Sequence, residues 1–257
     1  MNKLIFLGTG NAAHLTRQMT SLCIDTPKGA LLIDCGDGMG TVRQLVRAGV
    51  DLASVNDVFI THRHADHVIG MPHFLFLKML DKSTSVRVWG PDQALRVVKQ
   101  ISFLTHDLLV MNKERIAFCV VSPWKSRVVS NGCRVTAAPV RHISVTTYAL
   151  KVEVDGKSIV FTSDMGPNDN IERLSNGTDI LIHECFGLSK GEDRFHAGHS
   201  SAKDAGVLAQ KAGVKQLILT HFPAGVNFVE PEALASEARL YFKGEVRIAK
   251  DLMELCI

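Results

Sequence analysis

Four side chains that can bind a metal ion lie within six residues of one another in the segment 61–67. The segment reads Thr-His-Arg-His-Ala-Asp-His, and its candidate ligands are His62, His64, Asp66 and His67. Imidazole and carboxylate groups together suit zinc, and also manganese or iron, better than they suit calcium. Packing gains nothing from four such groups in six residues, so the cluster predicts a catalytic metal site.

Further candidate ligands follow apolar segments elsewhere in the chain. Apolar runs of strand-like composition end just before His62, His142, Asp164 and His221. Rigid scaffolds place chemistry on the loops at strand ends, so four such ends predict one shared site. The four ligands of the segment 61–67 cannot complete the coordination of two metal ions, and His142, Asp164 and His221 supply the three that are still needed.

The elements that must position these residues are short strands and dispersed helices. Strands are predicted over 3–7, 22–25, 30–33, 58–61, 86–89, 116–121, 134–138, 148–154, 158–162, 180–183, 216–220 and 246–248. Helices are predicted over 41–48, 68–80, 92–99, 202–211 and 231–240. Asp155-Gly156 between two apolar runs predicts a two-residue hairpin turn. We therefore expect sheets with helices packed outside them.

Composition restricts the class of protein. The chain has 257 residues, of which 46% are apolar and 21% charged, and no polar linker divides it, so one domain spanning 1–257 is expected. A net charge of +3 permits a phosphate-bearing substrate without demanding one. The six cysteines include no Cys-x-x-Cys pair, which favours buried thiols. The apolar stretch 4–7 is too short for a signal peptide, and none is long enough to span a membrane, so a cytoplasmic location is expected.

At these residues the sequence resembles the metallo-β-lactamase superfamily, whose signature is His-x-His-x-Asp-His. The resemblance extends over nearly the whole chain, through Phe6-Leu7-Gly8-Thr9-Gly10, Asp34-Cys35-Gly36-Asp37-Gly38, Ser163-Asp164 and Leu219-Thr220-His221. Within the superfamily it is most similar to the ribonuclease Z branch, on account of Ile182-His183-Glu184, Gly198-His199-Ser200-Ser201 and Thr220-His221-Phe222.

The resemblance implies an α/β fold, a four-layer αββα sandwich, with two zinc ions per chain (manganese or iron in their place). One metal would be held by His62, His64 and His142, the other by Asp66, His67 and His221, with Asp164 bridging. A hydroxide shared by the two metals would attack a phosphodiester. The resemblance makes His199 the candidate proton donor, oriented by Glu184, and Asp66 is counted as catalytic as well as a ligand.

Several of these residues have a structural alternative. His196 and His199 could instead cap a helix that starts near Ser201. Asp34 and Asp37 could orient ligand histidines or form a plain turn. Arg17 could meet an anionic substrate or lie in solvent. The apolar stripe on 71–79 could be core or the contact of a homodimer.

The chain departs from ribonuclease Z in one respect that bears on the substrate. Those enzymes carry a long arm for transfer RNA between the third histidine and the bridging aspartate, whereas only 21 residues (164 − 142 − 1) separate His142 from Asp164 here. We therefore expect a small-molecule or single-stranded nucleic-acid substrate, at an RNA end or in a small nucleotide ester. Hydrolysis of an aryl sulfate, carboxylic ester or lactone is the alternative reaction, and ligand binding without catalysis is a third possibility. The segment 101–131 could overhang the site.

Overall fold

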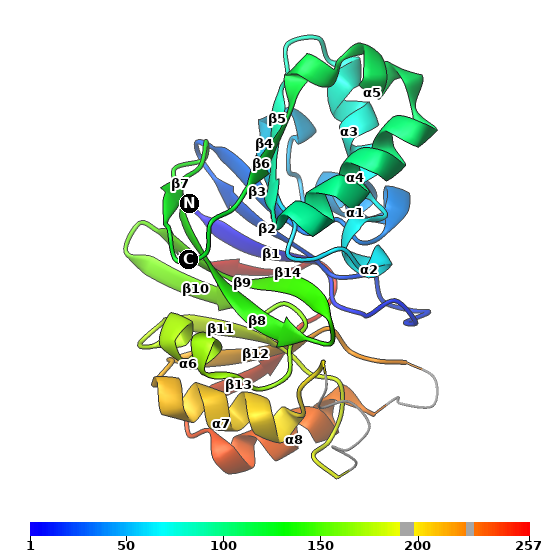
Figure 1. Cartoon of the computed structure of the whole chain (residues 1–257). Helices are drawn as coiled ribbons and strands as arrows, with labels where there is room; N and C mark the ends of the chain where they lie inside the picture. The colour runs from blue at the N-terminus through cyan, green and yellow to red at the C-terminus, as the bar shows by residue number, and fades with distance from the viewer. Residues whose placement is uncertain (191–197, 225–228) are drawn as a thin grey trace.

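Two sheets form the centre of the computed structural model, which describes residues 1–190, 198–224 and 229–257 (Figure 1). The strands of the first sheet lie in the order β14 (Met253–Cys256), β1 (Lys3–Gly8), β2 (Ser21–Thr26), β3 (Gly29–Ile33), β4 (Val55–Phe59), β5 (Val86–Gly90) and β6 (Ile116–Val120). Those of the second lie in the order β13 (Glu245–Ile248), β12 (Gln216–Thr220), β11 (Ile180–Glu184), β10 (Lys157–Phe161), β9 (Val145–Val154), β8 (Arg134–His142) and β7 (Arg127–Val128). Both sheets are mixed: strands β3 to β6 and β10 to β13 run parallel, and the others pair antiparallel.

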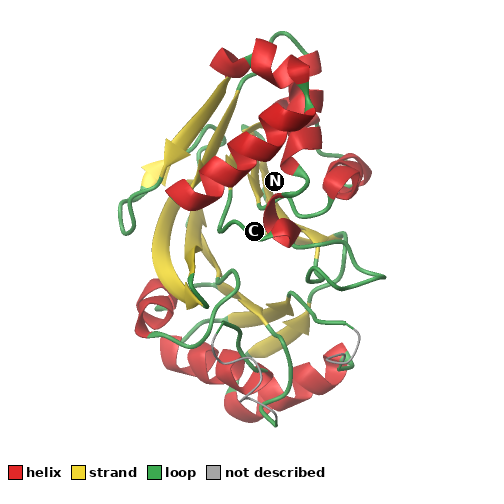
Figure 2. Cartoon of the chain, turned by 45° about the vertical axis from the view of Figure 1, so that its right-hand side comes forward, coloured by secondary structure: helices red, strands yellow, loops and turns green. Residues whose placement is uncertain are grey.

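Helices cover the outer faces of both sheets, while the inner faces pack on each other (Figure 2). The helices are α1 (Gly38–Arg47), α2 (Ala65–Val68), α3 (Met71–Leu80), α4 (Asp92–Thr105), α5 (Asp107–Met111), α6 (Asp169–Ser175), α7 (Ala202–Ala212) and α8 (Pro231–Tyr241), with 3-10 turns η1 (Leu52–Ser54) and η2 (Lys113–Arg115).

Alternation along the strands explains why they are apolar throughout. On β3, Leu31 and Ile33 enter the core between the sheets, whereas Leu32 faces the helices of the first half. On β12, Ile218 enters the same central core, and Leu217 packs against the helices of the second half. Both faces of such strands are buried, so apolar residues occupy successive positions. The predicted αββα sandwich is confirmed.

The predicted strands and helices are all present, although α4 continues six residues (105 − 99) beyond its predicted end and another helix is divided. The segment predicted as a single helix over 68–80 is divided at Gly70 into α2 and α3. A side chain at Gly70 would meet Cys35, whose Sγ and carbonyl oxygen lie 2.7 and 2.8 Å from the position of a Cβ atom, and the Gly70 amide donates to that carbonyl. Strands β7 and β14 and helices α5 and α6 were not predicted; the two helices, of five and seven residues, are too short for a helical repeat to show.

The Asp155-Gly156 turn is confirmed. It joins β9 to β10 as an antiparallel hairpin in which Val154 pairs with Lys157. Asp155 and Gly156 both have a positive φ, at 45° and 79°, as a type I′ turn requires.

Helix α3 buries the apolar stripe that could have been a dimer contact. Met71, Phe74, Leu75 and Met79 all pack in the core between the helices and the first sheet. Lys78 is buried with them, and its Nζ donates to the carbonyl oxygens of residues 52 and 53 at 3.0 and 2.9 Å. The stripe is therefore core.

The segment 101–131 is used to build the fold. It comprises the end of α4, then α5, η2, β6 and β7. Trp124 packs against the core of the second half, with the Arg173 guanidinium 4.4 Å from its ring. These contacts give the extra length a structural role. In the described ranges, no helix has the length and apolar character that crossing a membrane would require.

Asp57 ties strands β4 and β5 of the first sheet to the turn between β7 and β8 of the second sheet. Its fully buried carboxylate accepts two hydrogen bonds of 2.8 Å from the Arg87 guanidinium, and one of 2.7 Å from the Trp89 indole. The backbone amide of Ser130 donates to it at 2.8 Å, and the Ser130 hydroxyl donates as well. Burial alone would raise the pKa of Asp57, but these donors outweigh burial and hold its pKa below the ordinary value of 3.8.

Asp57→Asn is expected to lower the free energy of unfolding at pH 7 by about 2–4 kcal/mol, because Arg87 loses its charged partner and an amide group faces donors. A depressed folded-state pKa means that the stabilisation is complete above pH 3.8 and is lost as the pH falls through the folded-state value. Urea unfolding of both proteins should therefore show a difference that shrinks below pH 3.8. Asp92→Asn makes the same change in an exposed pair with Arg96, so its effect should be much smaller. Equal effects of the two changes would contradict this prediction.

Candidate metal centre

Both sheets contribute side chains to one site at their common edge. Strand β4 leads into His62 and His64, and the short helix α2 carries Asp66 and His67. Strand β8 ends at His142, and strands β10 and β12 end just before Asp164 and His221. Ser163, the residue before Asp164, has a left-handed backbone conformation (φ 55°). His221 and Asp34, which follow β12 and β3, also have positive φ values, both 57°. Backbone strain of this kind is held in place by its surroundings and turns the chain into the site.

The seven residues fall into two clusters that could each hold a metal ion. In each cluster one nitrogen or oxygen atom per residue lies within 4.8 Å of the others. The first cluster is His62, His64, His142 and Asp164, and the second is Asp66, His67, Asp164 and His221. The structure therefore brings together all seven residues in the grouping that the resemblance implies.

Asp164 belongs to both clusters. Its Oδ2 lies 3.9 Å from Nε2 of His62 and of His142, and 3.2 Å from Nε2 of His221. Its Oδ1 lies 3.4 Å from Nε2 of His67. A single buried carboxylate thus faces four imidazoles that come from both clusters.

The donor atoms at the centre of the site fit a metal ion. Nε2 of His62, Nε2 of His67 and Oδ1 of Asp164 are buried without a hydrogen-bond partner among the described residues, and an uncompensated buried polar atom is costly. Nδ1 of His64 lies 3.0 Å from Nε2 of His142, so two ring nitrogens face the same space. Divalent cations would satisfy all of these atoms, because nitrogen and carboxylate oxygen are their ordinary ligands.

The opposite edge of three of the rings is held by a second group. Nδ1 of His67 donates to the Asp34 carboxylate at 2.7 Å, and Nδ1 of His142 donates to the Gly198 carbonyl at 2.5 Å. Nδ1 of His221 lies 2.7 Å from the Thr20 hydroxyl. Such contacts fix the ring orientation and leave Nε2 as the free lone pair. Asp34 thus orients a candidate ligand, His67, whereas Asp37 forms the turn before α1.

Charge in the site also favours a cation. Burial lowers the pKa of His62, His64 and His142, so these rings stay neutral, as metal ligands must be. Burial would lower the pKa of His67 too, but Asp164, Asp34 and Asp66 raise it well above its ordinary value. Three carboxylates around one ring attract positive charge, which a metal ion supplies more strongly than a proton.

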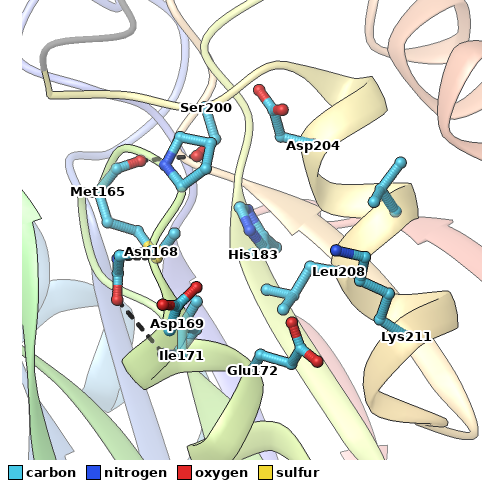
Figure 3. Close-up of a pocket in the computed structure, with 12 residues that line it drawn as sticks. Met165, Asn168, Asp169, Ile171, Glu172, His183, Ser200, Asp204, Leu208 and Lys211 are labelled. Carbon is cyan, nitrogen blue, oxygen red and sulfur yellow. Dashed lines mark hydrogen bonds between the residues drawn. The ribbon is translucent and has the colours of Figure 1, made fainter.

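His199 and Glu184 form a hydrogen-bonded pair beside the clusters. His199 Nδ1 donates to Oε1 of the fully buried Glu184 at 3.0 Å, and the His199 ring lies 5.0 Å from that of His142. The same Oε1 accepts from the amides of Met165 and Ser200, each at 3.1 Å. Figure 3 shows the back of this region, where the Ser200 hydroxyl donates to the Met165 carbonyl. The segments that follow Asp164 and His199 are thereby tied together.

The environment of His199 suits a proton donor. Burial would lower its pKa, but Glu184, Asp164 and Asp66 together raise the pKa to about 9. Bound divalent cations would act in the opposite direction and bring it closer to neutrality, where a general acid is most effective. Helix α7 begins at its own cap, because Ser201 and Asp204 form a capping box. His199 is therefore not needed as a cap, and His196 lies outside the described residues.

The glycine turn at residues 8–10 positions Asp66. Oδ2 of Asp66 accepts from the amide of Ala12 at 2.9 Å. The turn is anchored by Asp251, which accepts from the Thr9 hydroxyl at 2.6 Å and from the amide of residue 18 at 2.7 Å. Arg17 donates to the same Thr9 hydroxyl and lies 4.7 Å from the Phe222 ring, so its role is structural.

Sequence comparison places the chain in a family. The family model described as "Anti-Pycsar protein Apyc1" matches residues 2–233. The chain belongs to this Apyc1 family. A protein named ribonuclease Z from Methanothermobacter thermautotrophicus is 26% identical over 299 positions, which cover 98% of this chain and 96% of that protein. The probable metallo-hydrolase YhfI of Bacillus subtilis is 27% identical over 226 positions, covering 86% and 85%.

The crystal structure of YhfI, described as a metallo-β-lactamase fold protein, superposes with a TM-score of 0.84 at 24% identity, covering 99% of this chain and 98% of that one. The chain is thus an Apyc1-family member of the metallo-β-lactamase superfamily, in its ribonuclease Z-like branch. It is a metal-dependent hydrolase that uses divalent metal, and the third possibility, ligand binding without catalysis, is set aside.

The two alignments differ in length. The alignment with the ribonuclease Z spans 299 positions, so at least 42 of them (299 − 257) have no counterpart in this chain. The alignment with YhfI spans only 226 positions and covers 86% of this chain, so YhfI has few residues inserted relative to this chain. In this Apyc1-family member, the residues between His142 and Asp164 form the β8–β9 turn, β9, the hairpin turn and β10. A transfer-RNA arm has no place there.

Proposed function

We propose that this chain hydrolyses a phosphodiester in a small nucleotide ester or at a single-stranded RNA end, with two zinc ions bound in the two clusters. The observation that carries the proposal is the shared Asp164, flanked by both clusters and by the His199–Glu184 pair. Manganese or iron would suit the same donor atoms. A cytoplasmic location accompanies the proposal as an expectation from the sequence, whereas the stripe on 71–79 that suggested a homodimer is core.

The proposed roles follow from the contacts. His62, His64 and His142 would hold one ion, Asp66, His67 and His221 the other, and Asp164 would serve both. Bound divalent ions would supply Lewis-acid activation of water and of the phosphate. His199 would donate a proton to the oxygen of the leaving group, and Glu184 would hold the ring in the required orientation. Asp34 and Thr20 would keep their histidines directed at the centre.

The size of the substrate is inferred from what the chain lacks. Binding of a folded RNA rests on many contacts between basic side chains and distant phosphates, and each missing contact weakens the complex. The segment that carries the arm in ribonuclease Z is used here by a hairpin. This favours a small or single-stranded substrate.

The test is a panel of substrates on metal-replete protein, after elemental analysis of protein purified without chelator. We expect about two metal ions per chain and turnover of a dinucleotide, a cyclic nucleotide or a bis-aryl phosphodiester. A 3′-extended precursor transfer RNA should be a poor substrate. Absence of metal with no uptake of added zinc or manganese would refute the dinuclear site. Faster turnover of an aryl sulfate, carboxylic ester or lactone would favour the alternative reaction, and efficient cutting of the precursor would refute the size argument.

A further inference from the structure

A groove of about 590 Å³ lies between the segment 61–67 and strand β9. Arg63 in its wall is next to His64 in the sequence, and Thr146 in its wall pairs with Arg141, next to His142. Its walls come from four separate segments. Arg63 comes from the ligand segment itself, and Pro91 and Val97 from the start of α4. Val120 ends β6, and Thr146 and Tyr148 belong to β9. The volume lies in the ordinary range for small-molecule sites.

The groove is fixed to the metal centre through the backbone. Tyr148 donates its amide to the carbonyl of Thr61, the residue before the first ligand, at 3.1 Å. Thr146 lies in the strand that follows the turn after His142, and its amide donates to Oε1 of Gln93 at 3.4 Å. The β9 wall of the groove is therefore hydrogen-bonded to the segment that leads into His62 and to the start of α4.

Arg63 has no evident structural role. It lies between His62 and His64, yet its side chain is exposed, and its guanidinium has no partner among the described residues. The other arginine of the groove, Arg96, is paired with Asp92, so those two charges cancel. Arg63 thus leaves one uncompensated positive charge at the end of the groove nearest the ligands.

The chemistry of the groove changes along its length. Pro91, Val97, Val120 and the Tyr148 ring offer an apolar surface, and Val120 is 59% exposed. The Gln93 side chain adds hydrogen-bonding capacity at the edge. A flat, apolar group with polar edges fits this surface, and an anion fits beside Arg63.

We infer that this groove binds the nucleoside of the substrate, with the base on the apolar surface and Arg63 facing the phosphate. The inference rests on the proposed function and makes Arg63 and Val120 determinants of specificity. Because the apolar surface adds to the contact with the phosphate, the metal-loaded protein should bind a nucleotide more tightly than inorganic phosphate.

The test is isothermal titration of zinc-loaded protein with adenosine 5′-monophosphate and, separately, with inorganic phosphate. Wild type should bind the nucleotide about tenfold more tightly than phosphate. Val120→Asp should remove this advantage: its new charge repels both anions, but the nucleotide also loses its apolar contact and should therefore lose more affinity than phosphate does. Val128→Asp is the matched control, since Val128 is equally exposed (59%) but lies on β7 outside the groove.

A second pair of variants tests the charge. Arg63→Gln should weaken binding of the nucleotide about tenfold, as loss of a charge-assisted hydrogen bond does. Arg43→Gln removes an exposed charge from α1 and should have no such effect. Metal content should be unchanged in all four variants.

The outcomes separate the groove from the reaction. Equal affinity of wild type for nucleotide and phosphate, or equal losses in the two valine variants, would overturn the groove. Nucleotide binding that depends on Val120 and Arg63, in a protein that hydrolyses no phosphodiester, would support the groove and refute the proposed function. Phosphodiester turnover whose KM is the same in wild type and in Val120→Asp would support the proposed function and refute the groove.

Discussion

Asp164→Ala is expected to lower turnover of a phosphodiester by more than about 10²-fold, because even the loss of a group that only orients a ligand costs 10–100-fold. Asp164 does more than orient, since its two oxygens face histidines of both clusters at 3.2–3.9 Å. Both metal ions should bind more weakly. Elemental analysis after dialysis should find fewer than two ions per chain.

The control for this change is Asp25→Ala. Asp25 is a half-buried aspartate on β2 that belongs to neither cluster, so removing it takes no carboxylate from the metal centre. This variant should keep both metals and full activity. An Asp164→Ala protein with full metal content and normal turnover would mean that the bridging role belongs to another group.

His199→Ala is expected to slow hydrolysis of substrates with poor leaving groups by about 10²–10⁴-fold, the usual contribution of general acid–base catalysis. A nitrophenyl leaving group needs no proton, so its hydrolysis should suffer far less. Metal content should not change, because His199 is in neither cluster. Parallel kinetics on an alkyl or nucleoside ester and on a nitrophenyl ester measure the difference.

Two further variants make the result specific to His199. His73→Ala removes an exposed histidine from α3 and should leave both rates unchanged. Glu184→Gln should lower kcat on poor leaving groups with little change in KM, because Glu184 acts through the His199 ring. Equal losses on both leaving groups would instead indicate a defect of folding or metal binding.

The parts of the site that are close in sequence could be predicted from the sequence. Four ligand-type residues in the segment 61–67 are a local pattern, and the strand-end positions of His142, Asp164 and His221 follow from apolar periodicity. The resemblance to a known family then supplied the grouping into two clusters and the His199–Glu184 pair, whose hydrogen bond the structure shows.

The parts that depend on tertiary contacts could not be predicted. Thr20 contacts His221 across 201 residues, and nothing in the sequence around it marks a partner for a ligand. Helix periodicity continues through Gly70, but contact with Cys35 divides the helix there. Arg17 resembles an anion-binding residue near a glycine turn, whereas its actual partners include the carbonyl of Ala249, 232 residues away. The groove likewise draws its walls from four separate segments.

The anchoring of the glycine turn by Asp251 has a consequence for biosynthesis. Asp251 lies just before β14, and β14 pairs with β1, so that Lys3 is opposite Cys256 and the two ends of the chain lie close together (Figure 1). During translation, β1 keeps an unpaired edge, and the turn beside Asp66 lacks its two hydrogen bonds to Asp251, until residues 251–256 have left the ribosome. Closing so long a loop is also slow. We therefore expect the second cluster to take up its metal late in folding, after the sheet that supports the site has closed.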